Sequence, residues 1–168
     1  MKKKIFVSAG IFTLFLIGLL VWSLIPIRYH HTLDGVMFQQ GDNRHFKEVS
    51  ISIKGSMQRS FNANKVFKGT LSIKGDDNPI PGEDRKVKIH FNKEGIGSLV
   101  YGGFKEGVPY TYNYGLISVN DDLSEVVILN ETTNSKELYI IAAPAQNIKT
   151  AKKISSGLID NYKRDKNY

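Results

Sequence analysis

The sequence predicts a mainly β domain of the α+β class, with an antiparallel sheet of about seven or eight strands and one C-terminal amphipathic helix packed on it. From Gly35 to Ala143 the pattern is one of short β runs separated by turns, and several of these runs alternate between apolar and polar residues. Helical periodicity appears only after Pro144. Connections of hairpin length favour antiparallel pairing. The pattern leaves open whether the sheet stays flat or curls into a barrel.

The N-terminal part of the chain predicts one transmembrane helix. Residues 5–27 carry no charge, and fifteen of them are Leu, Ile, Val or Phe. A helix of that length reaches roughly 34 Å, against about 30 Å for the hydrocarbon core of a bilayer. Lys2, Lys3 and Lys4 precede it, so residues 1–4 are expected in the cytoplasm and the rest outside. The alternative, a cleaved signal peptide, has a shorter apolar core and a small-residue cleavage site, which residues 21–26 do not offer.

Residues 28–34 are interpreted as a short juxtamembrane stalk that precedes an extracytoplasmic domain over residues 35–163. His30 and His31 lie in this stalk without a third metal ligand nearby, so exposure is the simpler interpretation. The first strand is expected at 36–40.

Two further strands follow at 49–54 and 67–74. They contain nearly the same hexapeptide, at 50–55 and 70–75, which predicts two strands that end in equivalent turns. Residues 75–84 hold two prolines, two glycines and four acidic residues. Their spacing does not fit a calcium loop, so a solvated loop is expected.

The middle of the chain predicts two hairpins. Val87, Ile89 and Phe91 alternate with polar residues, and a turn at 92–95 follows them. The next strand, 98–104, is expected to bend at Gly102-Gly103 and to end in a turn at 105–107. In the strand 110–119 the apolar phase changes after Gly115, which indicates a bulge or a change of exposed face.

The last strands are expected at 126–130 and 138–143. The second of these is apolar throughout, so a central position with both faces covered is expected. Asn147 is a suitable N-cap for a helix over 147–163, followed by a frayed tail at 164–168. The helix is amphipathic and basic; packing on the sheet is favoured over lying on a membrane surface.

The composition excludes several chemistries. There is no cysteine, so the chain has neither a disulfide framework nor a thiolate nucleophile. No nucleophile elbow, zinc motif or phosphate loop is present, and Asp121-Asp122 reads as a turn. The sequence therefore predicts no catalytic residues, no metal, no cofactor and no nucleic-acid partner. The formal net charge of +7 fits solubility, or attraction to anionic lipids and wall polymers.

The most suggestive candidate site is aromatic. Tyr101, Tyr110, Tyr112 and Tyr114 come together if 98–104 and 108–119 form a hairpin. Tyrosines on an exposed sheet face stack on sugar rings or dock a peptide, because each has an apolar body and a polar tip. The alternative is that they pack across strands or under the helix.

The chain resembles small, N-terminally anchored, uncharacterised extracytoplasmic proteins of Gram-positive bacteria. The resemblance lies in the lysine-led anchor, Thr32-Leu-Asp-Gly35, Phe67-Lys-Gly69 leading to Ile73, and Tyr114-Gly-Leu-Ile117 leading to Asp122. It implies an envelope location and no activity or site residues.

These observations predict a non-enzymatic binding or accessory module in the cell membrane. Its partners would be the lipid bilayer, through residues 5–27, and a cell-wall component or another envelope protein. Two alternatives remain: an envelope enzyme or inhibitor with an unrecognised site, and a small subunit of a membrane complex. A deep pocket that holds His45 or His90 beside a carboxylate would favour an enzyme.

Overall fold

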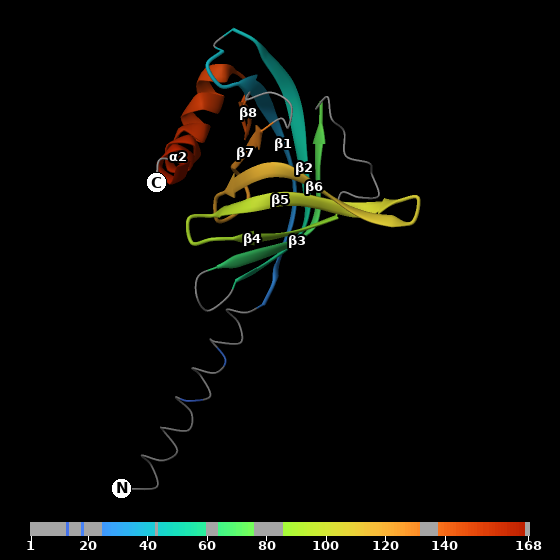
Figure 1. Cartoon of the computed structure of the whole chain (residues 1–168). Helices are drawn as coiled ribbons and strands as arrows, with labels where there is room; N and C mark the ends of the chain where they lie inside the picture. The colour runs from blue at the N-terminus through green and yellow to red at the C-terminus, as the bar shows by residue number, and fades with distance from the viewer. Residues whose placement is uncertain are drawn as a thin grey trace, which may run out of the picture.

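The computed structural model describes residues 25–42, 44–59, 64–75, 86–131 and 138–166, together with Thr13 and Gly18. Figure 1 shows a strongly curved sheet with one helix on its outside. Within the described ranges eight strands form a single antiparallel sheet. The strands are β1 (Ile27–Gln39), β2 (Phe46–Arg59), β3 (Lys65–Lys74), β4 (Lys86–Phe91), β5 (Ile96–Lys105), β6 (Val108–Val119), β7 (Val126–Glu131) and β8 (Leu138–Ala143), followed by helix α2 (Ile148–Lys166). The expected mainly β class, strand number and C-terminal helix are confirmed.

The strand order is β4-β3-β2-β1-β8-β7-β6-β5, so strands adjacent in sequence pair, apart from the edge strands β4 and β5, and β8 returns to β1. The edge strands β4 and β5 are joined by a tight turn in which the Asn92 backbone N–H donates to the carbonyl of Ile96 at 2.9 Å. At Gly97 a Cβ would come within 2.7 Å of the His90 carbonyl, so β5 runs close against β4 there. The sheet is therefore a nearly closed, up-and-down barrel.

Apolar side chains fill the barrel interior. All eight strands contribute to one cluster, because the apolar residues of each strand alternate toward the same side. Its fully buried members include Ile51, Phe67, Leu71, Ile89, Leu99 and Ile128. The alternation at residues 87–91 follows the sequence prediction, with Val87, Ile89 and Phe91 inside and His90 exposed. A barrel of about eight strands is just wide enough for side chains to fill.

A second apolar cluster lies outside the barrel, beneath helix α2. Ile140 and Ala142 of β8 face this helix, whereas Ile141 and Ala143 face the interior. β8 is therefore central, between β1 and β7, and covered on both faces as predicted. The helix begins where expected, because the Asn147 side chain accepts a hydrogen bond from the Thr150 backbone N–H at 2.9 Å. The helix continues to Lys166, so the expected tail at 164–168 begins later than predicted.

The expected stalk at residues 28–34 is wrong, because these residues form the first half of β1. β2 is fourteen residues long and offers a partner along this whole stretch, from Ile27 opposite Met57 onward. Leu33 lies opposite Ile51 and packs against the interior cluster. The polar side chains of this stretch face outward, which is why its composition resembled a linker.

Two local predictions are corrected. The bend expected at Gly102-Gly103 lies instead between Leu99 and Val100, where the register shifts against Gly115 of β6. The two similar hexapeptides do not end in equivalent turns. Gly75 ends β3 at a φ of 90°, whereas Gly55 lies inside β2 opposite Gly69, with the Phe67 ring against both glycines.

In the part of the chain that the structure describes, no helix has the length and apolarity needed to cross a membrane. Most of residues 1–24, and with them most of the anchor predicted at 5–27, lie outside the described residues, as does most of the predicted loop at 75–84. The predicted end of the anchor is wrong, because residues 25–27 are not helical and Ile27 begins β1.

Candidate functional site

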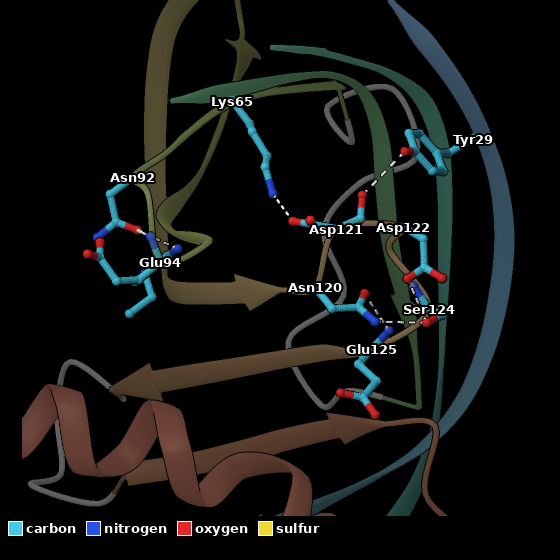
Figure 2. Close-up of polar contacts among 10 residues, drawn as sticks. Tyr29, Lys65, Asn92, Glu94, Asn120, Asp121, Asp122, Ser124 and Glu125 are labelled. Carbon is cyan, nitrogen blue, oxygen red and sulfur yellow. Dashed lines mark hydrogen bonds and ion pairs between the residues drawn. The ribbon is translucent and has the colours of Figure 1, made fainter. Parts of the chain in front are cut away.

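A polar cleft lies at the end of the barrel where β1 begins. The β4–β5 turn and the β6–β7 turn form its walls, and Lys65 reaches it from the first residue of β3. Figure 2 shows these side chains around the opening. We name it the turn cleft; it has a volume of about 530 Å³ and is lined by Lys65, Lys93, Glu94, Gly95, Val119, Asn120, Asp121 and Asp122.

The β6–β7 turn is fixed by its own side chains. Asn120 accepts a hydrogen bond from the Glu125 backbone N–H at 3.0 Å and donates to the Ser124 hydroxyl at 2.8 Å. Asp122 accepts from the backbone N–H and the hydroxyl of Ser124, at 3.1 and 2.7 Å. Leu123, at a φ of 58°, is buried in the interior cluster. The turn therefore closes this end of the core while its polar groups face outward (Figure 2).

The opposing β4–β5 turn is equally fixed. The Asn92 side chain accepts hydrogen bonds from the backbone N–H groups of Glu94 and Ile96, at 3.1 and 2.8 Å. The Val119 backbone N–H donates to the carbonyl of Gly95 at 3.0 Å, which ties this turn to the end of β6. The two walls of the turn cleft are thus joined by backbone hydrogen bonding, and the cleft is preorganised.

One ion pair crosses the turn cleft. The ammonium of Lys65 donates to the carboxylate of Asp121, and the Tyr29 hydroxyl donates to the Asp121 carbonyl at 3.4 Å. The Lys65 side chain is 12% exposed, whereas that of Asp121 is 79% exposed. The mostly buried Lys65 therefore holds the Asp121 carboxylate in place, while the Asp121 side chain remains accessible to a ligand from solvent.

Hydrogen bonds lower the pKa of both aspartates of the turn cleft. The hydrogen bond from Lys65 lowers the pKa of Asp121, and the hydrogen bond from the Ser124 side chain lowers the pKa of Asp122. Groups held as anions accept hydrogen bonds but do not act as general acids near pH 7. The two aspartates can therefore offer negative charge and hydrogen-bond acceptors to a group that enters the cleft.

The histidines do not build an acid–base site. His45 lies 2.7 Å from a carboxylate oxygen of Asp42, but this pair sits on the surface turn after β1 and the histidine side chain is 87% exposed. His30 and His90 are exposed on the outer face of the sheet, and His31 is half-buried beside Tyr29. Among the described residues, no three potential metal ligands lie together.

The structure divides the four candidate tyrosines. Their two strands pair as expected, with Tyr101 opposite Tyr112. Tyr101 and Tyr114 are each 1% exposed inside the barrel, with ring centroids 6.0 Å apart, and the Tyr101 hydroxyl donates to the Leu71 carbonyl at 3.2 Å. Tyr110 and Tyr112 are half-buried. An exposed face shared by all four is therefore wrong, and cross-strand packing of Tyr101 and Tyr114 is what the structure contains.

Sequence reasoning missed most of the turn cleft. It placed Glu94 in the turn at 92–95 and Asn120, Asp121 and Asp122 in a turn, as the structure does, but it did not bring the two turns together and gave no role to Lys65. Lys65 lies 56 positions from Asp121 in the chain, so no local pattern could link them. The Asn-Asp-Asp run before an apolar strand was the one available signal, since such residues build rigid turns with outward polar groups.

The fold and the turn cleft together define a class of protein: a small, nearly closed up-and-down β-barrel with a filled interior and a polar cleft at one end. Neither a protein-family model, nor a curated protein, nor a solved structure matches the chain.

Proposed function

We propose that this chain is a single-pass, membrane-anchored protein of the cell envelope whose β-barrel is a non-enzymatic binding module. The observation that carries this proposal is the preorganised turn cleft, whose charged groups of both signs open to solvent while the barrel interior is filled. Its ligand belongs to the polar components of the wall or to a peptide segment of an envelope protein, because such ligands offer both hydrogen-bond donors and anionic groups.

The apolar run at residues 5–27 supports the anchor. β1 begins at Ile27, and Tyr29 near its start contacts the β6–β7 turn. With that anchor, the chain leaves the bilayer at the start of β1, which is the end of the barrel that holds the turn cleft. The module therefore recognises a ligand close to the membrane surface. The resemblance to anchored extracytoplasmic proteins of Gram-positive bacteria agrees with this location.

Arrays of cell-wall glycans and peptides, probed with the full-length protein in nanodiscs, test the proposal. Binding to one ligand class is expected, and both Asp121→Asn and Glu94→Gln should weaken it at least about tenfold, because each removes an anionic acceptor from the turn cleft. Glu106→Gln is the matched control, since Glu106 lies in the turn at the other end of β5.

Two results would contradict the proposal. Absence of binding on both arrays, together with turnover of a wall substrate, would favour the enzyme alternative. Binding that none of the cleft variants weakens would place recognition on another surface of the chain.

A further inference from the structure

The outer face of β1 to β4 carries a dense set of cations. Strand alternation turns the apolar residues of these strands into the barrel, so that the lysines of β2, β3 and β4 point outward. Helix α2 packs over β8, β7 and the end of β1, next to this surface. We name the surface the basic face; its exposed cations are Arg28, Lys54, Lys68, Lys74, Lys86 and Lys88.

Strand register aligns five of these six cations, all but Lys74, in two transverse rows. In the first row His30 lies opposite Lys54, Lys54 opposite Thr70, and Thr70 opposite Lys86. In the second row Arg28, Ser56, Lys68 and Lys88 are successive partners. Adjacent strands are about 4.8 Å apart, and residues on one face of a strand repeat about every 6.6 Å. Neighbouring charges on the basic face are therefore separated by roughly 5–10 Å.

On the described residues of these four strands, exposed cations outnumber exposed acidic residues. The exposed acidic residues of these four strands are Asp34 and Glu48, both toward the end of the barrel away from the turn cleft. Within the described ranges, none of the six cations forms an ion pair. Lys68 and Lys88 are direct cross-strand partners, an arrangement that destabilises a sheet. A surface serving solubility alone would intersperse both signs.

The side chains between the cations narrow the class of ligand. Ser52, Ser56, Thr70 and Ser72 lie among them, and each hydroxyl both donates and accepts hydrogen bonds. The outward positions in the two rows carry no Phe, Tyr or Trp, so the basic face lacks the platforms on which nucleic-acid bases stack. The two rows also lack the large apolar side chains that enter a lipid interface; the exposed Phe46 of β2 lies outside them, at the start of that strand. The groups that remain for binding a ligand are the cations and the hydroxyls, and both form hydrogen bonds with phosphate oxygens.

We propose that the basic face binds a linear polymer with repeating phosphate groups, which lies across β2, β3 and β4 and contacts the two rows of cations. This surface shares no residue with the turn cleft, so the inference stands whether or not the cleft has a ligand. The polymer neutralises the Lys68–Lys88 repulsion, which explains why the sheet tolerates it.

Fluorescence anisotropy with labelled inorganic polyphosphate tests this proposal, using the full-length protein in nanodiscs of zwitterionic lipid. Binding should weaken steeply with salt, because each phosphate contact releases counterions. The double variant Lys68→Gln, Lys88→Gln should weaken binding at least about tenfold at low salt. It should also reduce the slope of log K against log salt by roughly 1.4, since each contact to a single strand contributes about 0.7.

The control is the double variant Lys149→Gln, Lys153→Gln, which removes the same charge from the exposed side of helix α2. It should bind as the wild type does, and Lys68→Arg, Lys88→Arg should retain affinity. Single-stranded oligothymidylate of matched charge is the second probe. Equal affinity for the two polymers would support recognition of repeating phosphates in general. Weaker affinity for oligothymidylate would support a preference for the closer phosphate spacing of polyphosphate. Equal losses in both Gln variants, no binding of polyphosphate, or binding only to anionic vesicles would overturn the proposal.

Discussion

At the scale of single residues, Gly115 has the most constrained backbone in the barrel. Its φ of 142° lies in a region that side chains disfavour, and a Cβ there would come 2.0 Å from the Leu129 carbonyl of the neighbouring strand. The register against β5 shifts at this point, so that Tyr114 just before it and Ile117 just after it both face the interior. The bulge thus allows one strand to keep its apolar residues inside on both sides of a phase change.

Gly115→Ala should therefore lower the free energy of unfolding by about 3 kcal/mol, from backbone strain and from overlap with β7. Gly107→Ala is the matched control, because Gly107 has a φ of 80° but open space around it. The control should cost only about 1 kcal/mol, from strain alone. Denaturant unfolding of both variants measures the two losses in the free energy of unfolding. Equal losses would contradict the prediction, because the overlap with β7 would then add no cost.

Asp42 provides a pH dependence at the β1–β2 turn. The Arg44 backbone N–H, at 2.7 Å, and the His45 ring lower the pKa of the Asp42 carboxyl from 3.8 to about 2. The unfolded chain therefore takes up this proton first as the pH falls. The contribution of Asp42 to stability is complete above about pH 4 and is lost as the pH falls through about 2.

Asp42→Asn should reduce the loss of stability between pH 4 and pH 2, because the amide does not titrate. Thermal unfolding at half-unit pH intervals, with the wild type in parallel, measures the change. Curves of the two proteins that stay parallel over this window would exclude a role for Asp42.

At the scale of secondary-structure elements, the pairing of β3 with β4 brings together inward side chains that stabilise the sheet and outward side chains that destabilise it. Their inward residues, such as Phe67 opposite Ile89, pack in the core, whereas their outward residues place Lys68 opposite Lys88. Exposed cross-strand pairs contribute less than about 1 kcal/mol, and burial of large apolar side chains contributes more. The interior therefore determines the pairing of these strands, and the outer face is free to carry charge for another purpose.

Lys68→Glu should raise the free energy of unfolding by up to about 1 kcal/mol at low salt, because it replaces a repulsive pair with an attractive one. Salt should reduce the gain by screening. The same substitution in a Lys88→Gln background is the control and should give a smaller gain. A gain of the same size in both backgrounds would mean that the two side chains do not interact. The variant should also lose affinity for polyphosphate, so that stability and binding change in opposite directions.

At the scale of the whole molecule, the barrel separates its surfaces. The turn cleft lies at the end where β1 begins, the basic face covers the outer side of β1 to β4, and helix α2 covers β8 and its neighbours. The β5–β6 hairpin extends from the barrel with Phe104 and Val108 exposed at its tip (Figure 1). An anchor at residues 5–27 would hold the end with the cleft close to the bilayer.

The proposed anchor predicts in which cell fraction the protein is found and whether protease reaches its barrel. The protein should remain in the membrane fraction after a high-salt wash, because apolar burial is insensitive to salt screening. Protease added to intact cells with a permeable wall should degrade the barrel. Replacement of residues 5–24 by an unrelated transmembrane helix should leave both results unchanged. Full-length protein in the cytosol, or a shortened product in the medium, would contradict the anchor.

The sequence alone determined the elements whose pattern is local. Short β runs separated by turns located all eight strands, and period-two alternation marked those at 49–54 and 87–91. Asn147 located the start of the helix, and the uninterrupted apolar run at 138–143 indicated a central strand. The phase change after Gly115 indicated the bulge, because side chains on a pleated strand alternate strictly and one inserted residue reverses the order. Residues 28–34 could not be recognised as a strand, since their polar residues face solvent and their partner is β2.

Only the tertiary structure decided which residues meet. Tyr101 and Tyr114 have the composition of a binding face, yet the curvature of the sheet encloses them. Lys65 joins Asp121, and Lys54, Lys68 and Lys86 come together on one face, through pairings between distant strands. Alternation specifies which side of its own strand a residue faces. Strand order, register and closure specify its neighbours, and these depend on how the whole apolar surface is buried.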